Sequence, residues 1–202
     1  LLAWLMLDGG LDPSFMIGGL PKNLGAGARF TNGQHTVLEG DEYDTAFFDK
    51  RSKFLHYLPE VVVINNIEFD HADIYDSLDE IKLSFRRLLN VTPRNGIAFI
   101  NGDDANCLDV SKGAPTRVSF VGFGENCDRR ITDVTYSESG SAFTVSGEAY
   151  NVPLSGEFNV RNTAMAVSAT LVSLPRQSKH RSPSSRGSPV VRRFVASFVG
   201  YA

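Results

Sequence analysis

Acidic side chains follow two short apolar runs in the first half of the chain. Glu39 comes directly after Val37 and Leu38, and Asp70 with His71 lies a few residues beyond the run Val61–Ile64. In an open α/β sheet, ligands bind in the loops beyond the carboxyl ends of the strands. Carboxylates and one neutral imidazole at two such ends predict a site for a hard divalent cation that carries phosphates.

Basic side chains lie between these two acidic groups, at Lys50, Arg51 and Lys53. Beside a cation site they are candidates to bind a phosphate or carboxylate of a substrate. Two plainer interpretations stay open. Acidic residues at strand ends are often solvated loops, and a short basic run is usually a solvated surface.

The elements that must position these residues follow from the apolar pattern. Val61–Ile64 and Ile97–Ile100 are continuous apolar runs, which is typical of strands buried on both faces of a parallel sheet. Between them, residues 76–89 carry apolar side chains at helical spacing, with Asp76 as the candidate N-cap.

The pattern changes in the second half of the chain. From Arg130 to Phe158 apolar residues alternate with a period of two, which predicts antiparallel hairpins, and 159–174 predicts a helix that Asn159 could cap. We therefore predict an α/β fold, a mostly parallel sheet flanked by helices with a small antiparallel subsheet.

Composition limits the class of protein. The 202 residues, 42% hydrophobic and 21% charged, are sufficient for one sizeable globular domain with an appendage. Cys107 and Cys127 have no metal-ligand spacing and fit a reducing compartment, so we expect a cytoplasmic protein. The apolar start, Leu1–Leu7, is far shorter than the ~20 residues of a membrane span, so no membrane partner is expected.

The last 27 residues differ from the rest. Residues 176–202 hold six of the 20 Lys and Arg and no Asp or Glu, leaving 14 basic against 23 acidic side chains in 1–175. Residues 177–189 are rich in Ser, Arg and Pro, which predicts disorder. The apolar residues 194–199 have no pattern that connects them to the body. A basic tail could bind nucleic acid weakly, but no aromatic interleaving supports it, and no nucleic-acid partner is expected.

Four motifs in order resemble the central, ATP-binding domain of the Mur ligases, over roughly residues 1–174. They are Glu39–Asp44, Asn65–Asp73, Asn101–Asn106 and Gly156–Asn162. The run Asp41–Phe54 is similar to the murein-recycling branch of that family. The resemblance implies a P-loop-NTPase-like α/β domain that uses ATP and Mg²⁺.

The resemblance also implies a reaction. ATP phosphorylates a carboxylate, and an amine attacks the acyl phosphate to give an amide, ADP and phosphate. In the murein-recycling branch the partners would be UDP-N-acetylmuramate and a recovered murein tripeptide. Cations suit this chemistry because they neutralise the transferring phosphoryl group and hold two anionic substrates together.

Roles for individual residues come from the same resemblance. Glu39 matches the metal-binding glutamate, and His71 matches the histidine that holds a second magnesium. Asn159 and Asn162 match the asparagines that reach the adenine, and Asn66 and Asp70 lie beside the metal positions. Phe158 stands where related branches often have His.

Departures from the family lead to further expectations. The resemblance places a phosphate-binding loop just upstream of Leu1, and a C-terminal domain where residues 175–202 stand. We therefore expect a fragment that does not turn over by itself, with a tail that is disordered or out of frame. Two alternatives stay open: another ligase of the family, such as the branch that adds L-alanine or the folylpolyglutamate type, or a non-catalytic remnant. The oligomeric state stays open.

Overall fold

A mixed sheet forms the centre of the protein. The computed structural model describes residues 1–41, 44–46, 49–69, 75–174 and 192–197. Across the sheet the strands lie in the order β11 (Glu148–Val152), β10 (Gly140–Val145), β9 (Arg129–Ser137), β8 (Arg117–Gly122), β7 (Ile97–Asn101), β6 (Val61–Ile64), β12 (Arg192–Ser197), β3 (His35–Glu39), β1 (Ser14–Met16) and β2 (Ala28–Arg29). The strands from β9 through β1 run parallel, whereas β10, β11 and β2 pair antiparallel. The predicted α/β sheet with a small antiparallel section is confirmed.

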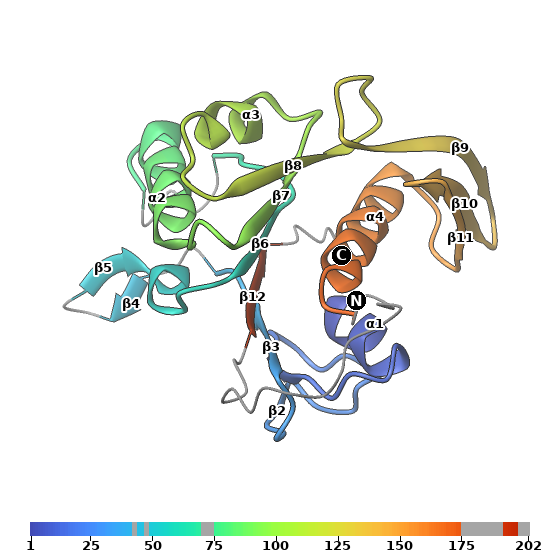
Figure 1. Cartoon of the computed structure of the whole chain (residues 1–202), viewed down its shortest axis with the longest axis horizontal. Helices are drawn as coiled ribbons and strands as arrows, with labels where there is room; N and C mark the ends of the chain where they lie inside the picture. Colours follow the sequence, from blue (N-terminus) through green and yellow to red (C-terminus); the bar gives the residue numbers. More distant parts are fainter. Residues whose placement is uncertain (42–43, 47–48, 70–74, 175–191, 198–202) are drawn as a thin grey trace, which may run out of the picture.

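Helices cover both faces of the parallel strands (Figure 1). On one face α1 (Leu2–Asp8) packs against α4 (Glu157–Leu171), and on the other α2 (Leu78–Val91) packs against α3 (Ala105–Ser111). A separate two-stranded sheet, β4 (Asp44–Ala46) and β5 (Asp49–Ser52), leads into a 3₁₀ turn, η1 (Lys53–His56), on the α2 side. The molecule is therefore a three-layer α/β/α arrangement, with the antiparallel strands β10 and β11 at one end of the sheet and β2 at the other.

Strand β6 shows why the continuous apolar runs are buried. Successive side chains of a strand point to opposite faces. Val61 and Val63 belong to the hydrophobic cluster under α1 and α4, while Val62 and Ile64 belong to the cluster under α2 and α3. All four are at most 4% exposed, so this strand buries both of its faces.

Helix α2 begins one residue later than the sequence indicated. Ser77 is the N-cap, and its hydroxyl accepts a hydrogen bond from the Glu80 backbone N–H, while the Glu80 carboxylate accepts from the N–H of Asp76. Asp76 as N-cap is therefore wrong. The Ser77 hydroxyl thus satisfies one free N–H group of the first turn, and the Glu80 carboxylate satisfies the N–H of the residue before the N-cap.

Helix α4 is buried on all sides from residue 163 to residue 170, whereas its first turn and its last residue are more exposed. It follows Gly156, whose φ of 108° suits glycine, and contains the small buried residues Ala164, Ala166 and Ala169. The N-cap position belongs to Gly156, so the prediction that Asn159 caps this helix is wrong. Asn159 lies within the first turn instead.

The last described strand, β12, lies in the middle of the sheet. It pairs parallel with β3 on one side and with β6 on the other. The Phe194 ring is 1% exposed and belongs to the same cluster as Val37 and Val61, its partners in the two neighbouring strands. For residues 192–197 the expectation of an unconnected tail is wrong. The backbone of β12 pairs with the edges of β3 and β6, and the Phe194 side chain is buried in the core. Residues 175–191 lie outside the described part of the chain.

Candidate functional site

Glu39 stands at the carboxyl end of β3. Its carboxylate is exposed and accepts a hydrogen bond from the backbone N–H of Gly18, in the loop after β1. A Cβ atom on Gly18 would lie 2.7 Å from Glu39 Oε2, so a side chain there would displace the carboxylate. Parallel pairing of β1 and β3 brings these two strand ends to the same edge of the sheet.

Asn159 and Asn162 reach the same edge from α4. They are three residues apart, so they lie on one face of the helix. The Asn159 amide donates to the Ser155 carbonyl at 2.8 Å, and the Asn162 carboxamide oxygen accepts from the side-chain amide of Asn65. Asn65 follows β6 directly and is 5% exposed, so it fixes Asn162 to the centre of the sheet.

A cavity of about 270 Å³ joins these residues. Its walls come from the start of α1, the end of β3 and the first turns of α4, and are mostly apolar. Glu39, Asn159 and Asn162 all line it. An apolar cleft with a few convergent polar groups at the carboxyl edge of a parallel sheet is the usual form of a ligand site.

The other sequence candidates lie elsewhere or outside the described residues. The Asn66 amide donates to Glu68 Oε1 at 3.0 Å, and Asn66 is not among the residues that line the cavity. Asp70 and His71 lie outside the described part of the chain, as does the side chain of Lys50. Nothing in the structure therefore assigns them a place.

Arg51 and Lys53 pair with acidic neighbours. Arg51 makes a two-pronged contact with the Asp49 carboxylate, with both N···O distances 2.8 Å. Lys53 Nζ lies 3.2 Å from Asp41 Oδ2. The hydrogen bonds from Arg51 hold the pKa of Asp49 well below its ordinary value. These basic groups lie on β5 and η1, and neither lines the cavity.

A family model confirms where the chain belongs. The Mur ligase middle domain matches residues 19–170, which include Glu39, Asn159 and Asn162. The chain belongs to the Mur ligase family.

Individual relatives agree with this assignment. A UDP-N-acetylmuramate--L-alanyl-gamma-D-glutamyl-meso-2,6-diaminoheptandioate ligase of Haemophilus influenzae is 34% identical over 84% of this chain and 38% of its own length. A UDP-N-acetylmuramate--L-alanine ligase of Geotalea uraniireducens is 32% identical over 85% of this chain and 37% of its own. The chain thus spans about two fifths of the length of these relatives.

A solved structure shows the same fold. The crystal structure of UDP-N-acetylmuramate:L-alanyl-gamma-D-glutamyl-meso-diaminopimelate ligase from Neisseria meningitides superimposes with a TM-score of 0.75 at 35% identity. The match covers 86% of this chain and 57% of that one.

The donor atoms around the cavity of this Mur ligase domain fit a magnesium nucleotide. Mg²⁺ prefers oxygen ligands and usually takes one or two carboxylates together with phosphate oxygens and water. Glu39 offers one carboxylate, and the asparagines offer amide groups. Among the described residues, no group of three or more His, Cys, Asp or Glu side chains is close enough to hold a metal alone. The described residues therefore fit an ion that is bound partly by Glu39 and partly by phosphate oxygens of a nucleotide.

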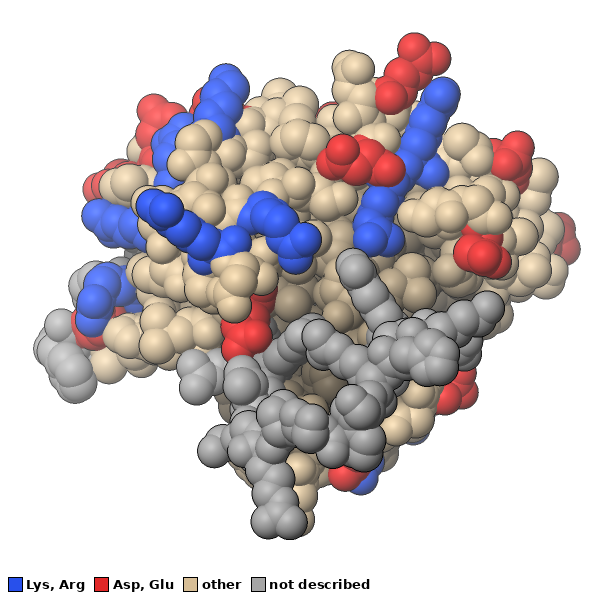
Figure 2. Space-filling view, in the orientation of Figure 1, with Lys and Arg blue, Asp and Glu red and all other residues tan. Residues whose placement is uncertain are grey.

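Basic side chains also gather over α2 and α3, on the left of the face that Figure 2 shows. Lys82, Arg86 and Lys112 all approach the Asp109 carboxylate, at 3.6, 2.7 and 3.4 Å. The shared carboxylate partly balances this cluster, and we assign no ligand to it. No helix within the described ranges is both long and apolar enough to cross a membrane.

Sequence reasoning missed three residues that hold this edge together. Asn65 was overlooked beside Asn66, although an Asn directly after a fully buried run is a signal worth weighing. The sequence pattern assigns no individual role to Asp103, within the motif Asn101–Asn106, or to Arg161, within Gly156–Asn162. Their partners are 97 and 58 residues away along the chain, and no local pattern reveals such pairs.

Proposed function

We propose that this chain is the nucleotide-binding part of an ATP-dependent amide-forming ligase. The convergence of Glu39, Asn159 and Asn162 on one cavity carries the proposal. Family membership adds the reaction class, because the relatives named above are ligases. The γ-phosphoryl group of ATP passes to a substrate carboxylate, and an amine then displaces phosphate to form the amide.

Each residue has a defined task in this proposal. Glu39 holds Mg²⁺, with His71 and Asp70 assigned to the metal region by resemblance alone. Asn159 and Asn162 bind the adenine side of the nucleotide. Asn66 does not line the cavity and is assigned to the metal region by resemblance alone. The bound ion supplies neutralisation of the phosphoryl charge. The apolar walls contributed by Leu2 and Val37 exclude water, which strengthens each polar contact.

Nucleotide binding is the first test, in a polypeptide that adds the remaining length of the relatives to this chain. We expect calorimetry to detect Mg²⁺-dependent binding of ADP, and Glu39→Gln to abolish the magnesium dependence because the carboxylate charge is lost while its size is kept. Glu138→Gln is the matched control, since Glu138 is exposed in the turn between β9 and β10. Binding that is equally strong without Mg²⁺, or unaffected by Glu39→Gln, contradicts the role of Glu39.

The substrates are proposed to be UDP-N-acetylmuramate and a murein tripeptide. The Haemophilus relative, whose name contains such a peptide, supports this choice. The Geotalea relative, at nearly the same identity, supports L-alanine as the second candidate. Because the chain lacks most of the length of these enzymes, we expect no turnover by residues 1–202 alone.

Substrate choice is tested in a polypeptide that adds the remaining length of the relatives to this chain. Phosphate release is measured with ATP, UDP-N-acetylmuramate and either tripeptide or L-alanine. Faster release with tripeptide supports the first candidate, and faster release with L-alanine supports the second. If no phosphate is released with either tripeptide or L-alanine, the result contradicts a ligase of this kind.

A further inference from the structure

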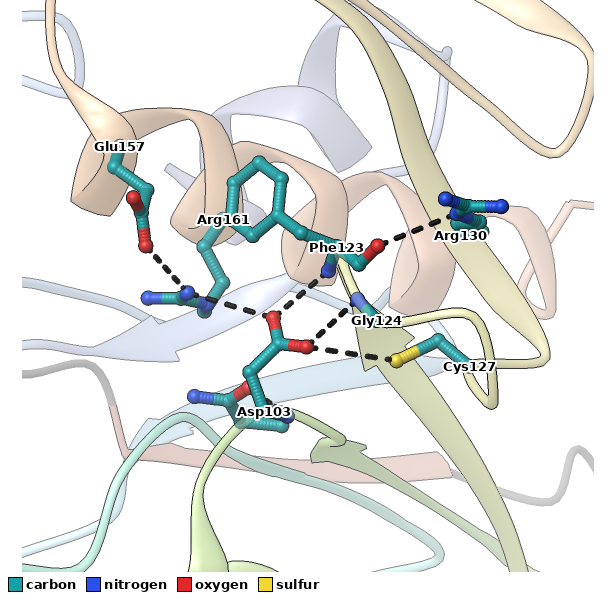
Figure 3. Close-up of polar contacts among 8 residues, drawn as sticks. Asp103, Phe123, Gly124, Cys127, Arg130, Glu157 and Arg161 are labelled. Carbon is teal, nitrogen blue, oxygen red and sulfur yellow. Dashed lines mark hydrogen bonds and ion pairs between the residues drawn. The ribbon is translucent and has the colours of Figure 1, made fainter.

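Asp103, two residues beyond the end of β7, is held by the backbone of a neighbouring turn. Asp103 Oδ2 accepts from the Phe123 N–H and Oδ1 from the Gly124 N–H, both at 2.8 Å (Figure 3). The Asp103 N–H in turn donates to Asn101 Oδ1 at 2.9 Å. A carboxylate that accepts several N–H groups is strongly fixed in position. Asp103 therefore joins the end of β7 to the turn after β8.

Glycines make this close approach possible. A Cβ atom on Gly124 would lie 2.9 Å from Asp103 Oδ1, and one on Gly122 would collide with the same carboxylate. Gly102 likewise leaves room for the Cys127 sulfur. The turn is thus built around the Asp103 carboxylate, and a side chain at Gly122 or Gly124 would displace that carboxylate.

Arg161 connects this turn to helix α4. Its Nη2 lies 3.4 Å from Asp103 Oδ2 and 2.7 Å from Glu157 Oε1, and its guanidinium stands 5.0 Å from the centre of the Phe123 ring. Figure 3 shows the guanidinium between the two carboxylates. The Arg161 side chain is 12% exposed, and its Nε has no hydrogen-bond partner within the described residues. Burying this cation costs free energy that the two ion pairs must offset.

The position of Arg161 within α4 gives this network a consequence for the cavity. Arg161 lies between Asn159 and Asn162, and at about 100° per residue its side chain leaves the helix in a different direction from theirs. Asn162 contacts Asn65 at the end of β6, while Arg161 contacts Asp103 at the end of β7. The second turn of α4 is thus fastened to two neighbouring strands at once.

We propose that Asp103 and Arg161 form a positioning pair that sets how the first two turns of α4 present Asn159 and Asn162 to the ligand. This inference rests on the proposed nucleotide function. Neither residue lines the cavity, so the pair acts through the asparagines and not by touching the ligand.

The chain offers matched variants. Arg161→Met removes both ion pairs at nearly constant length, and Arg161→Lys keeps the charge. Arg130→Met is the control, because Arg130 reaches the Phe123 carbonyl at 3.3 Å from β9 and has no part in α4. Asp103→Asn leaves a single oxygen for the two N–H groups of the turn.

The first readout needs no ligand. In protein labelled with ¹⁵N-asparagine, the side-chain amide signals of Asn159 and Asn162 are assigned by their loss in alanine variants. We expect Arg161→Met and Asp103→Asn to move these signals, Arg161→Lys to restore them in part, and Arg130→Met to leave them unchanged. Signals that stay at the wild-type positions in Arg161→Met, even with a lowered melting temperature, would overturn the proposal and leave a structural role only.

The second readout is the affinity for ADP with Mg²⁺. We expect Arg161→Met to weaken binding by about tenfold, since the loss of a residue that orients a ligand-binding group commonly has that effect. In the double variant Arg161→Met with Asp103→Asn, the loss of ADP affinity should be smaller than the product of the two single losses, because the residues act as one unit. Full wild-type affinity in Arg161→Met contradicts positioning. Absence of ADP binding in wild type rejects the proposed function, and the amide signals still decide the positioning pair.

Discussion

The side-chain amide of Asn65 donates a hydrogen bond to the carboxamide oxygen of Asn162, joining the end of β6 to the second turn of α4. The Asn162 oxygen accepts from Asn65, so the NH₂ group is the donor that Asn162 offers to the cavity it lines. The other amide atom of Asn65, its Oδ1, is buried without a partner within the described residues.

Asn65→Asp should therefore reverse the Asn162 amide, since an aspartate cannot donate. A charge at a position only 5% exposed should also lower the free energy of unfolding, by about 2–3 kcal/mol. Denaturant melts measure the change in the free energy of unfolding, and ADP titration measures the effect of the reversed Asn162 amide on ligand binding. Asn151→Asp, on the exposed surface of β11, is the control that should change neither. Wild-type stability in Asn65→Asp would contradict the buried contact.

Phe194 in β12 leads to a prediction about stability. Its ring is 1% exposed and lies 5.9 Å from the His35 ring, centre to centre. Phe194→Ala should lower the free energy of unfolding by about 3–5 kcal/mol, the usual cost of truncating a buried aromatic side chain. Phe30→Ala, at a residue 87% exposed, should change it by no more than about 0.5 kcal/mol. Equal effects of the two variants in urea melts would mean that β12 does not occupy the sheet.

Asp49 should titrate abnormally. Hydrogen bonds from the Arg51 side chain and backbone hold the pKa of Asp49 below its ordinary value of 3.8. A lowered pKa in the folded state stabilises the protein above the unfolded pKa, and this contribution disappears as the pH falls through the folded value. The stability difference between wild type and Arg51→Met should thus be constant above about pH 5 and shrink in acid. Carboxyl NMR titration should show the Asp49 midpoint rising in Arg51→Met.

The two thiols should react at different rates. Burial, with Asp104 nearby, raises the pKa of Cys107, which is fully buried. Burial and Asp103 also raise the pKa of Cys127, but that residue is partly exposed. A thiol reagent should label Cys127 first, faster at alkaline pH, and reach Cys107 only when the protein unfolds. In Cys127→Ser, rapid labelling of the native protein would contradict the burial of Cys107.

Much of the fold could be predicted locally. Val61–Ile64 is a continuous apolar run, which predicts burial of both faces of the strand. In the structure its side chains alternate between the two hydrophobic clusters. The alternating pattern after Arg130 gave the antiparallel strands β9 to β11, with the turn between Ser137 and Gly140. Errors of one to a few residues at Asp76 and Asn159 arose because several polar residues near a helix start can serve as caps.

The candidate site was predictable in part. The strand-end position of Glu39 and the helical spacing of Asn159 and Asn162 are local features that the sequence shows. The fold brings these three residues to one cavity. The partner of Arg51 was not predictable, because the sequence allowed either a substrate group or a solvated surface. The structure pairs Arg51 with Asp49.

The sequence by itself determined the family, the parallel core and the residue types at the strand ends, because these depend on periodicity and on short motifs. Only the tertiary structure decided that β12 enters between β3 and β6, that Asn65 meets Asn162 and that Arg161 meets Asp103. These contacts join segments far apart along the chain. Their formation depends on which buried edges and charges remain unsatisfied once the rest of the sheet has assembled, and no local pattern encodes that balance.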